Sequence, residues 1–268
     1  MSSFVDDLDV VDETIAPSEP VYPLAQWLNG DPKLAAAGGV AHTGGVILPV
    51  KHVPEDVKLA PSWTRTTVTF ANGKSEAVLA SHKAALAVVR TRFRWRAQQN
   101  GATTYFPRTG YVGGAGLRGN LQVLCGIYGY AFPVVVTFTG RASQEFERLL
   151  QEFNHKVLEA ARRLGMGKAG ANGHTPPRLP RFAFYMKLVP GPHQKAGQKS
   201  AEAIITPPVL QLPDEVTPEY LSAAYVGRER LVELQQLYHD ATEWTQAWDR
   251  LPGPVRNGSG PDDAESVE

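Results

Sequence analysis

Residues 86–96, LAVVRTRFRWR, decide how the centre of this chain folds, because arginines alternate with other residues at the end of the run. Strict alternation with a period of two predicts a β-strand, on which successive side chains point to opposite faces. Thr91, Phe93 and Trp95 would then share one face and fill the core. The arginines on the other face, here called the arginine ladder, are Arg90, Arg92, Arg94 and Arg96.

The spacing of the arginine ladder suits a chain of phosphates. At about 3.3 Å per residue the arginines recur every ~6.6 Å, close to the phosphate spacing of an extended single strand. Like charges on one face repel one another, and no Asp or Glu lies near them in the sequence. The ladder therefore predicts contact with a nucleic-acid backbone. The alternative is that it pairs with distant carboxylates from residues 143–164 or 202–243.

The net charge of zero conceals an uneven distribution of charge along the chain. Residues 1–20 carry a charge of −6 and residues 251–268 a charge of −3, which leaves +9 for residues 21–250. Residues 77–144 and 160–201 contain no acidic residue, and each of these windows contains eight basic ones. A positive body between negative ends is typical of a protein with a polyanionic partner. The alternative is that the bases are scattered over a solvated surface.

Aromatic residues share the window of the ladder, and nucleic-acid bases stack on aromatic rings with about 1–3 kcal/mol each. We expect the tyrosines of this window to lie in loops or turns, although core packing is an equal alternative for each one alone. The glycine-rich residues 110–119 and the connector 165–181 are interpreted as flexible, basic segments. The predicted nucleic-acid contacts are Arg90, Arg92, Arg94, Arg96, Tyr105, Arg108, Tyr111, Arg118, Tyr128, Tyr130 and Lys168.

Short strands are predicted throughout the central part of the chain. Asn72-Gly73 suits a tight turn with positive φ and predicts a hairpin between residues 66–70 and 76–80. Further strands are expected at residues 45–50, 120–130, 133–139 and 182–189.

Two helical regions are predicted. Apolar residues at helical spacing indicate a helix over residues 143–164, with Ser143 as its cap and Glu145 and Glu147 in its first turn. The second region begins at Thr217, a cap followed by proline, breaks near Gly227 and resumes to residue 250.

These elements predict an α+β fold: a small β-barrel or curled antiparallel sheet of the OB type, with one mid-chain helix and a C-terminal helical segment. The β-rich, nucleic-acid-binding core would cover residues 21–212, and the helical segment residues 213–250. Residues 1–20 and 251–268 are acidic and poor in apolar residues, so we expect them to be disordered tails.

Several other classes of protein are not favoured. The N-terminus lacks the apolar stretch of a signal peptide, no segment is apolar enough for a membrane helix, and one cysteine gives no disulfide framework. Cys125 lies in an apolar run and is interpreted as a small buried hydrophobe. The histidines show no metal-ligand spacing, and the GxGxxG matches in residues 110–119 and 165–170 lack the strand-to-helix context of a nucleotide site. We therefore expect no cofactor, no metal and a cytoplasmic location.

The order of elements over residues 85–210 resembles a known class of protein. A strand over 117–128, the strand PVVVTFTG over 133–140, a helix opened by ASQEF, a basic linker and FAFYMKL over 182–188 follow one another. This order is similar to uncharacterised phage- and plasmid-borne proteins and to OB-fold single-stranded-DNA-binding proteins. The resemblance implies a five-stranded barrel that binds DNA on its sheet face. The acidic C-terminus is similar to the partner-recruiting tails of bacterial single-strand binders, although it lacks their terminal aromatic residue.

The sequence thus predicts a non-catalytic, sequence-tolerant protein that binds single-stranded nucleic acid, with DNA expected, in replication or recombination. A structural or assembly subunit of a nucleoprotein or phage-like complex is the second hypothesis, and an enzyme with an unrecognised site is the third. A protein partner of the acidic C-terminal tail and a homo-oligomer remain open.

Overall fold

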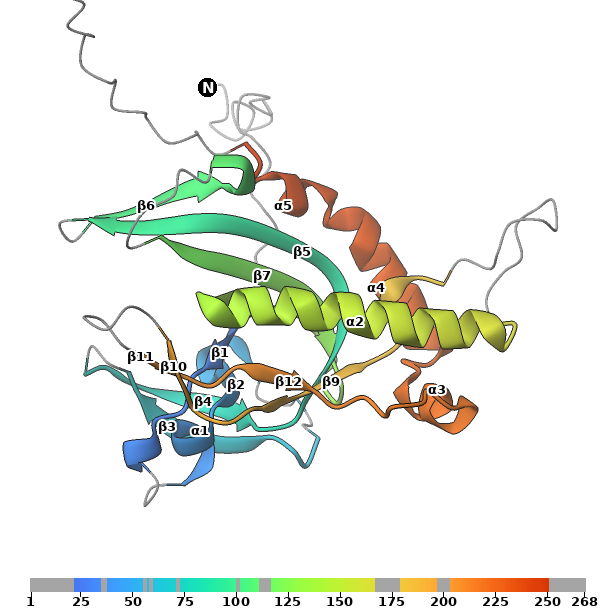
Figure 1. Cartoon of the computed structure of the whole chain (residues 1–268), viewed down its shortest axis with the longest axis horizontal. Helices are drawn as coiled ribbons and strands as arrows, with labels where there is room; N and C mark the ends of the chain where they lie inside the picture. The colour runs from blue at the N-terminus through green and yellow to red at the C-terminus, as the bar shows by residue number, and fades with distance from the viewer. Residues whose placement is uncertain are drawn as a thin grey trace, which may run out of the picture.

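The computed structural model of this chain describes residues 22–34, 38–54, 57, 60–70, 73–99, 102–110, 117–166, 179–196 and 203–250. It is an α+β protein dominated by one large sheet (Figure 1). The strands of the large sheet are β1 (Leu24–Leu28), β2 (Gly45–Pro49), β3 (Thr64–Thr69), β4 (Ser75–Ser81), β5 (Ala84–Gln99), β6 (Ala102–Pro107), β7 (Arg118–Ile127), β8 (Pro133–Thr139), β9 (Met186–Pro190) and β12 (Pro208–Leu210). A separate two-stranded sheet is formed by β10 (Gln194–Ala196) and β11 (Ala203–Ile205).

The helices are fewer and lie mostly in the second half of the chain. They are α1 (Gly39–Thr43), α2 (Arg141–Arg163), α3 (Pro218–Ala224), α4 (Arg228–Asp240) and α5 (Thr242–Gln246). Short 3₁₀ turns are η1 (Pro32–Leu34), η2 (Val50–His52), η3 (Arg108–Gly110) and η4 (Arg181–Ala183).

The large sheet is open. Its strands follow the order β12-β9-β5-β7-β8-β1-β2-β4-β3, and β6 pairs with β5 beside this path. All pairs are antiparallel except that between β1 and β8. Over the described residues β3 and β12 lie at opposite ends of the path and do not pair, so the predicted small barrel is wrong. The alternative, a mostly antiparallel sheet, is confirmed.

The long strand β5 organises the sheet. It pairs with β7 along most of its length, while its other edge pairs with β9 near Ala84 and with β6 from Arg94 onward. A β-bulge at Val89 interrupts the register with β7, and bulges bend the strand that carries them. Figure 1 shows the resulting curve, which carries the outer half of β5, together with β6 and the part of β7 paired with it, away from β2, β3 and β4.

The bulge is held by a half-buried arginine, Arg181. The Arg181 guanidinium of η4 donates two hydrogen bonds to the Val89 carbonyl oxygen, at 3.2 and 2.9 Å from Nε and Nη2. Burial lowers the pKa of Arg181, and the positive charge of Arg90 lowers it further. The residues predicted as a strand from 182 onward begin within this 3₁₀ turn, and the strand itself starts only at Met186.

Local patterns place the remaining strands as predicted. β3 and β4 form the expected hairpin, and Gly73 in its turn has a φ of 78°, a conformation that glycine adopts without strain. The strands expected at residues 45–50, 120–130 and 133–139 correspond to β2, β7 and β8.

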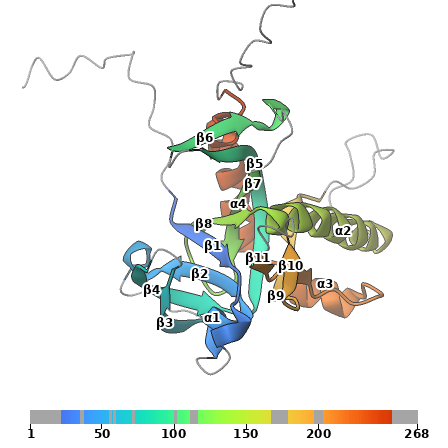
Figure 2. The ribbon, with the colours of Figure 1, turned by 60° about the vertical axis from the view of Figure 1, so that its left-hand side comes forward.

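Helix α2 covers one face of β7 and β8 (Figures 1 and 2). Its apolar stripe includes Phe146, Phe153 and Val157, and the Phe146 ring stacks on that of Phe138 with centroids 4.3 Å apart. The predicted cap is wrong, because the helix begins at Arg141 and its N-cap is Gly140 with a φ of 58°. Ser143 is instead buried in the first turn and donates a hydrogen bond to the Gly140 carbonyl oxygen at 2.6 Å.

Of the C-terminal helices, α4 and α5 lie on the face of the sheet opposite α2, whereas Leu221 and Ala224 of α3 belong to the core cluster on the α2 side. Thr217 caps α3 as predicted, with its Oγ1 accepting a hydrogen bond from the Tyr220 backbone amide. From α4 onward the chain covers the face of β7 and β8 that α2 leaves open, where Leu124 and Val135 pack against Trp244. The sheet is therefore sandwiched between α2 on one side and α4 and α5 on the other.

A buried polar junction joins the start of the described chain to β12. Thr206 is fully buried, and its carbonyl oxygen accepts a hydrogen bond from Trp27 Nε1 at 2.7 Å. Its Oγ1 accepts from the Gly30 amide at 3.0 Å, and its own amide donates to Asn29 Oδ1 at 3.0 Å. Every polar atom of this threonine is thus satisfied by residues more than 170 positions away in sequence.

Candidate nucleic-acid interface

The arginine ladder lies on the sheet face covered by α4 and α5. Directly opposite residues share a face in an antiparallel pair. The register between β5 and β7 therefore places Gln122 beside Arg92, Asn120 beside Arg94 and Arg118 beside Arg96. This face of β5 and β7 is polar along its outer half and apolar where Leu124 meets Trp244.

Two of the ladder arginines stand in a column that alternates with aromatic rings. The Arg92 guanidinium carbon lies 4.2 Å from the ring centroid of Trp244 and 4.3 Å from that of Trp248. The Arg94 guanidinium carbon lies 4.0 Å from Trp248 and 3.5 Å from Tyr105. Both arginines thus stack between two rings, and each such cation–π contact contributes about 0.5–2 kcal/mol.

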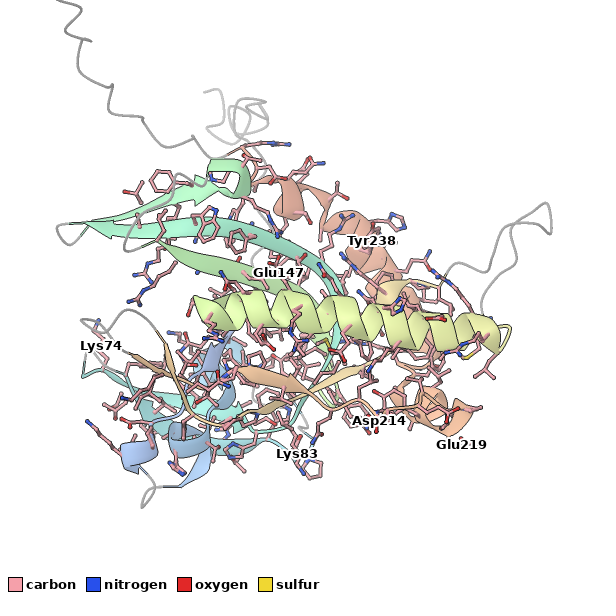
Figure 3. All side chains as sticks on the ribbon, viewed as in Figure 1. Lys74, Lys83, Glu147, Asp214, Glu219 and Tyr238 are labelled. Carbon is pink, nitrogen blue, oxygen red and sulfur yellow. The ribbon has the colours of Figure 1, made fainter. Side chains whose placement is uncertain are left out.

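Arg90 and Arg92 also hydrogen-bond to the C-terminal helices. Arg90 Nε donates to the Tyr238 carbonyl oxygen at 2.7 Å and Nη2 to Thr242 Oγ1 at 2.9 Å, while its guanidinium lies 3.9 Å from the Tyr238 ring centroid (Figure 3 labels Tyr238). Arg92 Nη1 donates to the Trp244 carbonyl oxygen at 2.9 Å and Nε to Gln122 Oε1 at 2.9 Å. These two arginines therefore attach α4 and α5 to the sheet, a structural role that the sequence did not predict.

The outer end of the ladder is different. Arg96 lies directly opposite Arg118 on β7 and directly opposite Tyr105 on β6. Arg118 is exposed and Arg96 half-buried, and over the described parts of the chain neither forms an ion pair with a carboxylate. Tyr105 lies on a strand rather than in the predicted loop or turn. We call Arg94, Arg96, Tyr105, Arg118 and Asn120 the distal strip.

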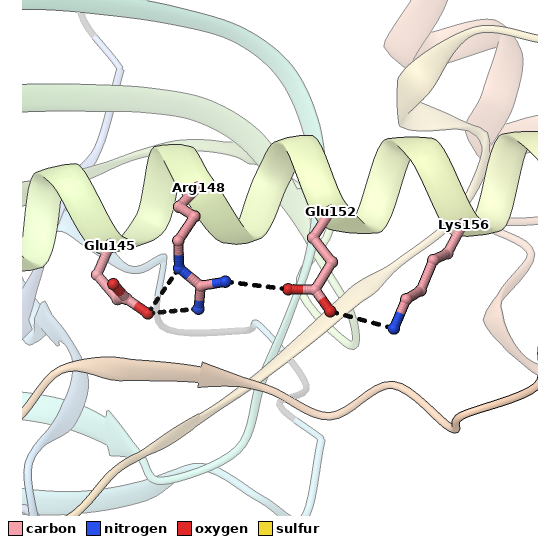
Figure 4. A network of polar contacts seen from close by, with 4 residues as sticks. All are labelled: Glu145, Arg148, Glu152 and Lys156. Atoms are coloured by element: carbon pink, nitrogen blue, oxygen red, sulfur yellow. Dashed lines mark hydrogen bonds and ion pairs between the residues drawn. The ribbon is translucent and has the colours of Figure 1, made fainter.

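The glutamates of α2 whose ion pairs can be described bind cations outside the arginine ladder. Glu145 and Glu152 pair with Arg148 at 2.6 and 3.2 Å, and Lys156 extends this network from Glu152 at 3.2 Å (Figure 4). Glu147, labelled in Figure 3, pairs with Arg108 at 2.9 Å. A carboxylate of residues 143–164 thus reaches one predicted contact residue, Arg108, and the other paired glutamates of this network bind cations of their own helix.

The face of β5 opposite the ladder is only partly core. Phe93 is buried as predicted, but Thr91 and Trp95 are half-buried. The Trp95 ring meets Phe93 edge-on with centroids 4.9 Å apart, and its Nε1 donates to the Arg108 carbonyl oxygen at 3.2 Å. Gly119 lies directly opposite Trp95 on β7. A Cβ at Gly119 would lie 2.6 Å from Ser143 Oγ, so the absence of a side chain allows α2 to approach the sheet closely here.

Two predicted tyrosines lie at the other end of β7, about 30 Å from Arg118 along ten residues of strand. Tyr130 is 4% exposed and burial raises its pKa, so it belongs to the core rather than to a binding surface. Tyr128 is 60% exposed and meets Tyr185 edge-on. The structure therefore does not bring these two residues together with the distal strip, while Tyr111 and Lys168 lie outside the described residues.

The described residues show no cluster of metal-ligating side chains. They contain no group of three or more His, Cys, Asp or Glu side chains placed to hold a metal ion, and the rings of His42 and His193 form only a pair, 5.5 Å apart. Cys125 is fully buried, as predicted, and burial raises the pKa of its thiol. Among the helices that can be described, none has the length and apolar character to cross a membrane.

Sequence reasoning missed the residues that cover the ladder. Tyr238, Trp244 and Trp248 lie in the C-terminal helical segment, and Asn120 and Gln122 share the ladder face. The four-residue spacing of Trp244 and Trp248 was a usable signal, because it places both rings on one side of a helix.

Comparison with protein-family models, with curated proteins and with solved structures finds no match for this chain.

Proposed function

We propose that this protein binds single-stranded nucleic acid, with DNA expected, through the distal strip and without catalysis. The observation that carries the proposal is the direct cross-strand pair of Arg96 and Arg118. Like charges directly opposite one another destabilise a sheet. A phosphate bound between the two guanidinium groups would turn this repulsion into attraction, since arginine donates paired hydrogen bonds to phosphate oxygens.

The surroundings of this pair supply the second element of single-strand binding. Tyr105 lies opposite Arg96, and its ring already stacks on the Arg94 guanidinium. Aromatic platforms beside a positively charged groove bind successive bases without strong sequence preference. The proposal therefore keeps Arg94, Arg96, Tyr105 and Arg118 as contacts, and it assigns Arg90 and Arg92 to the attachment of the C-terminal helices.

A panel of fluorescently labelled oligonucleotides tests this function by anisotropy. Single-stranded DNA, duplex DNA and RNA of the same sequence are compared at several salt concentrations. We expect the single-stranded DNA to bind most tightly, with an affinity that falls steeply with salt because phosphate contacts release counterions. Absence of salt-dependent binding to all three nucleic acids would refute the proposal.

The resemblance to OB-fold single-stranded-DNA-binding proteins supports this proposal only through the order of elements over residues 85–210. A five-stranded barrel is not part of the proposal, since the sheet is open.

A different surface favours the second hypothesis, an assembly subunit. Tyr128 and Phe132 are 60% and 43% exposed at the turn between β7 and β8, and exposed aromatic residues are enriched in protein interfaces. Replacing both by Ser should then abolish self-association or complex formation, followed by light scattering, while nucleic-acid binding at the distal strip stays unchanged.

A further inference from the structure

We propose that Trp248 occupies a slot between Arg92 and Arg94 that a purine base, with adenine preferred, enters when nucleic acid binds. This inference rests on the proposed function and names the base that the distal strip would read. It makes the end of the C-terminal helical segment an internal competitor for the binding site.

The slot is defined by two cation–π contacts, one on each side of the Trp248 ring. The Trp248 ring centroid lies 4.3 Å from the Arg92 guanidinium carbon and 4.0 Å from that of Arg94, so one flat bicyclic ring is stacked between two planar cations. A purine base is also flat and bicyclic, and it stacks on guanidinium planes in the same way. A base that replaces the indole would therefore restore both stacking contacts that the displaced tryptophan loses.

The position of Trp248 makes such an exchange feasible. It follows α5, a helix of five residues, and lies near the end of the described chain. Trp244 is different, since it is embedded with Leu124, Val135 and Ala241 in an apolar cluster. Trp248 is itself only 5% exposed, so the proposal requires the turn after α5 to move away from the sheet while Trp244 keeps α5 attached.

A buried polar side chain beside the slot points to the ligand. Asn120 lies directly opposite Arg94 on the same face, is 9% exposed, and its Oδ1 accepts no hydrogen bond from any described residue. An unsatisfied buried acceptor costs free energy, and the N6 amino group of adenine is a donor that would satisfy it. An asparagine amide pairs with the N6 and N7 atoms of adenine through two hydrogen bonds. Thymine can also pair with an amide through N3–H and O4, but it is a single ring and covers less of the two guanidinium planes.

The test compares the parent protein with Trp248→Ala by fluorescence anisotropy. The probes are DNA single strands of about a dozen nucleotides: one with thymine only, one with adenine at alternate positions, and one with an abasic backbone. We expect Trp248→Ala to bind the adenine strand about tenfold more tightly than the parent does, the effect of freeing one stacking site. Affinity for the abasic strand should stay within about twofold, because phosphate contacts are unchanged.

Tyr238→Ala is the matched control, since Tyr238 stacks on Arg90, which lies on β5 two residues before the slot residue Arg92. This variant also removes an aromatic ring from the C-terminal helices that cover the arginine ladder, and we expect its affinity for the adenine strand to equal that of the parent. Adding Asn120→Ala to the Trp248→Ala protein should weaken binding of the adenine strand and reduce its preference over thymine to the part that the larger ring gives.

A direct readout follows Trp248 in the parent protein and uses a variant only to assign its signal. In parent protein labelled with 5-fluorotryptophan, the ¹⁹F resonance of Trp248 is assigned through Trp248→Phe, and the adenine strand is added to saturation. The Trp248 resonance should move to the position of an exposed indole while that of the buried Trp27 stays in place.

The outcomes separate the two proposals. If parent and variants bind no strand, the proposed function and the slot are both refuted. If the parent binds but Trp248→Ala gains nothing and the Trp248 resonance does not move, the slot alone is refuted, and Trp248 is a structural part of the column.

Discussion

The paired arginines of the distal strip allow the electrostatic part of binding to be predicted in numbers. Changing Arg96 and Arg118 together to Gln removes both members of the cross-strand pair. Each phosphate neutralised on a single strand contributes about −0.7 to the slope of log K against log salt, so loss of the one phosphate held between the two guanidinium groups should flatten that slope by about 0.7. The affinities of parent and variant should converge at about 1 M salt, and at about 0.1 M the variant should bind roughly fivefold more weakly.

The same double substitution, which should weaken binding, should not weaken the folded state. Repulsion between directly opposed like charges destabilises a strand pair by roughly 0.2–1 kcal/mol, and the double variant relieves it. Its Tm at low salt should therefore equal or exceed that of the parent. A residue pair required only for folding would instead lower Tm when replaced.

A charge-matched control separates local contact from net charge. Arg162→Gln with Arg163→Gln changes the net charge equally at two exposed positions in the last turn of α2. We expect the control to keep the salt slope of the parent, measured by anisotropy at four or more salt concentrations. The reasoning fails if the Arg96/Arg118 variant keeps the parental slope, if the control flattens it equally, or if the Tm of the Arg96/Arg118 variant falls.

The other predictions concern stability and reactivity. Arg92→Ala should lower the free energy of unfolding by about 2–4 kcal/mol in urea titrations, since it loses charged hydrogen bonds and stacking to the C-terminal helices; a smaller loss than for an exposed arginine would contradict this role. Phe93→Ala should cost about 3–5 kcal/mol in the same assay and Trp95→Ala clearly less, because only Phe93 is buried. Burial raises the pKa of Cys125, so the folded protein keeps the thiol proton above the unfolded value of about 8.5. The stabilisation is complete below that pH and declines above it, and iodoacetamide at about pH 8.5 should alkylate Cys125 only after denaturation; rapid alkylation of the native protein would show that the thiol is accessible.

The local structure was largely predictable because it depends on short-range patterns. The alternation in residues 86–96 and the Asn72-Gly73 turn define β5 and the β3–β4 hairpin. The apolar spacing from residue 143 defines most of α2. The start of α2 was missed because a glycine with positive φ caps it, and glycine lacks the side-chain oxygen by which Ser143 was favoured.

The long-range structure was not predictable from these patterns. The arginines of the ladder suggested an exposed basic face because the sequence shows no acidic residue near them. Arg90 is instead satisfied by Tyr238 and Thr242, about 150 positions away, through a carbonyl oxygen, a hydroxyl and a ring. Partners without charge leave no signal in a charge pattern, and so the ladder's division into an attached inner part and an open outer part emerged only from the structure.

The junction around Thr206 determines when this protein can finish folding. Trp27, Asn29 and Gly30 leave the ribosome early, but the threonine that satisfies them follows 176–179 positions later. Closing so long a loop is entropically costly, so these contacts form late and slow the final step of folding. Until then the polar groups of Trp27 on β1 and of Asn29 just after it lack these partners and are exposed to the surroundings of the nascent chain. A stalled or truncated product that ends before residue 206 would therefore be prone to aggregation and to recognition by chaperones.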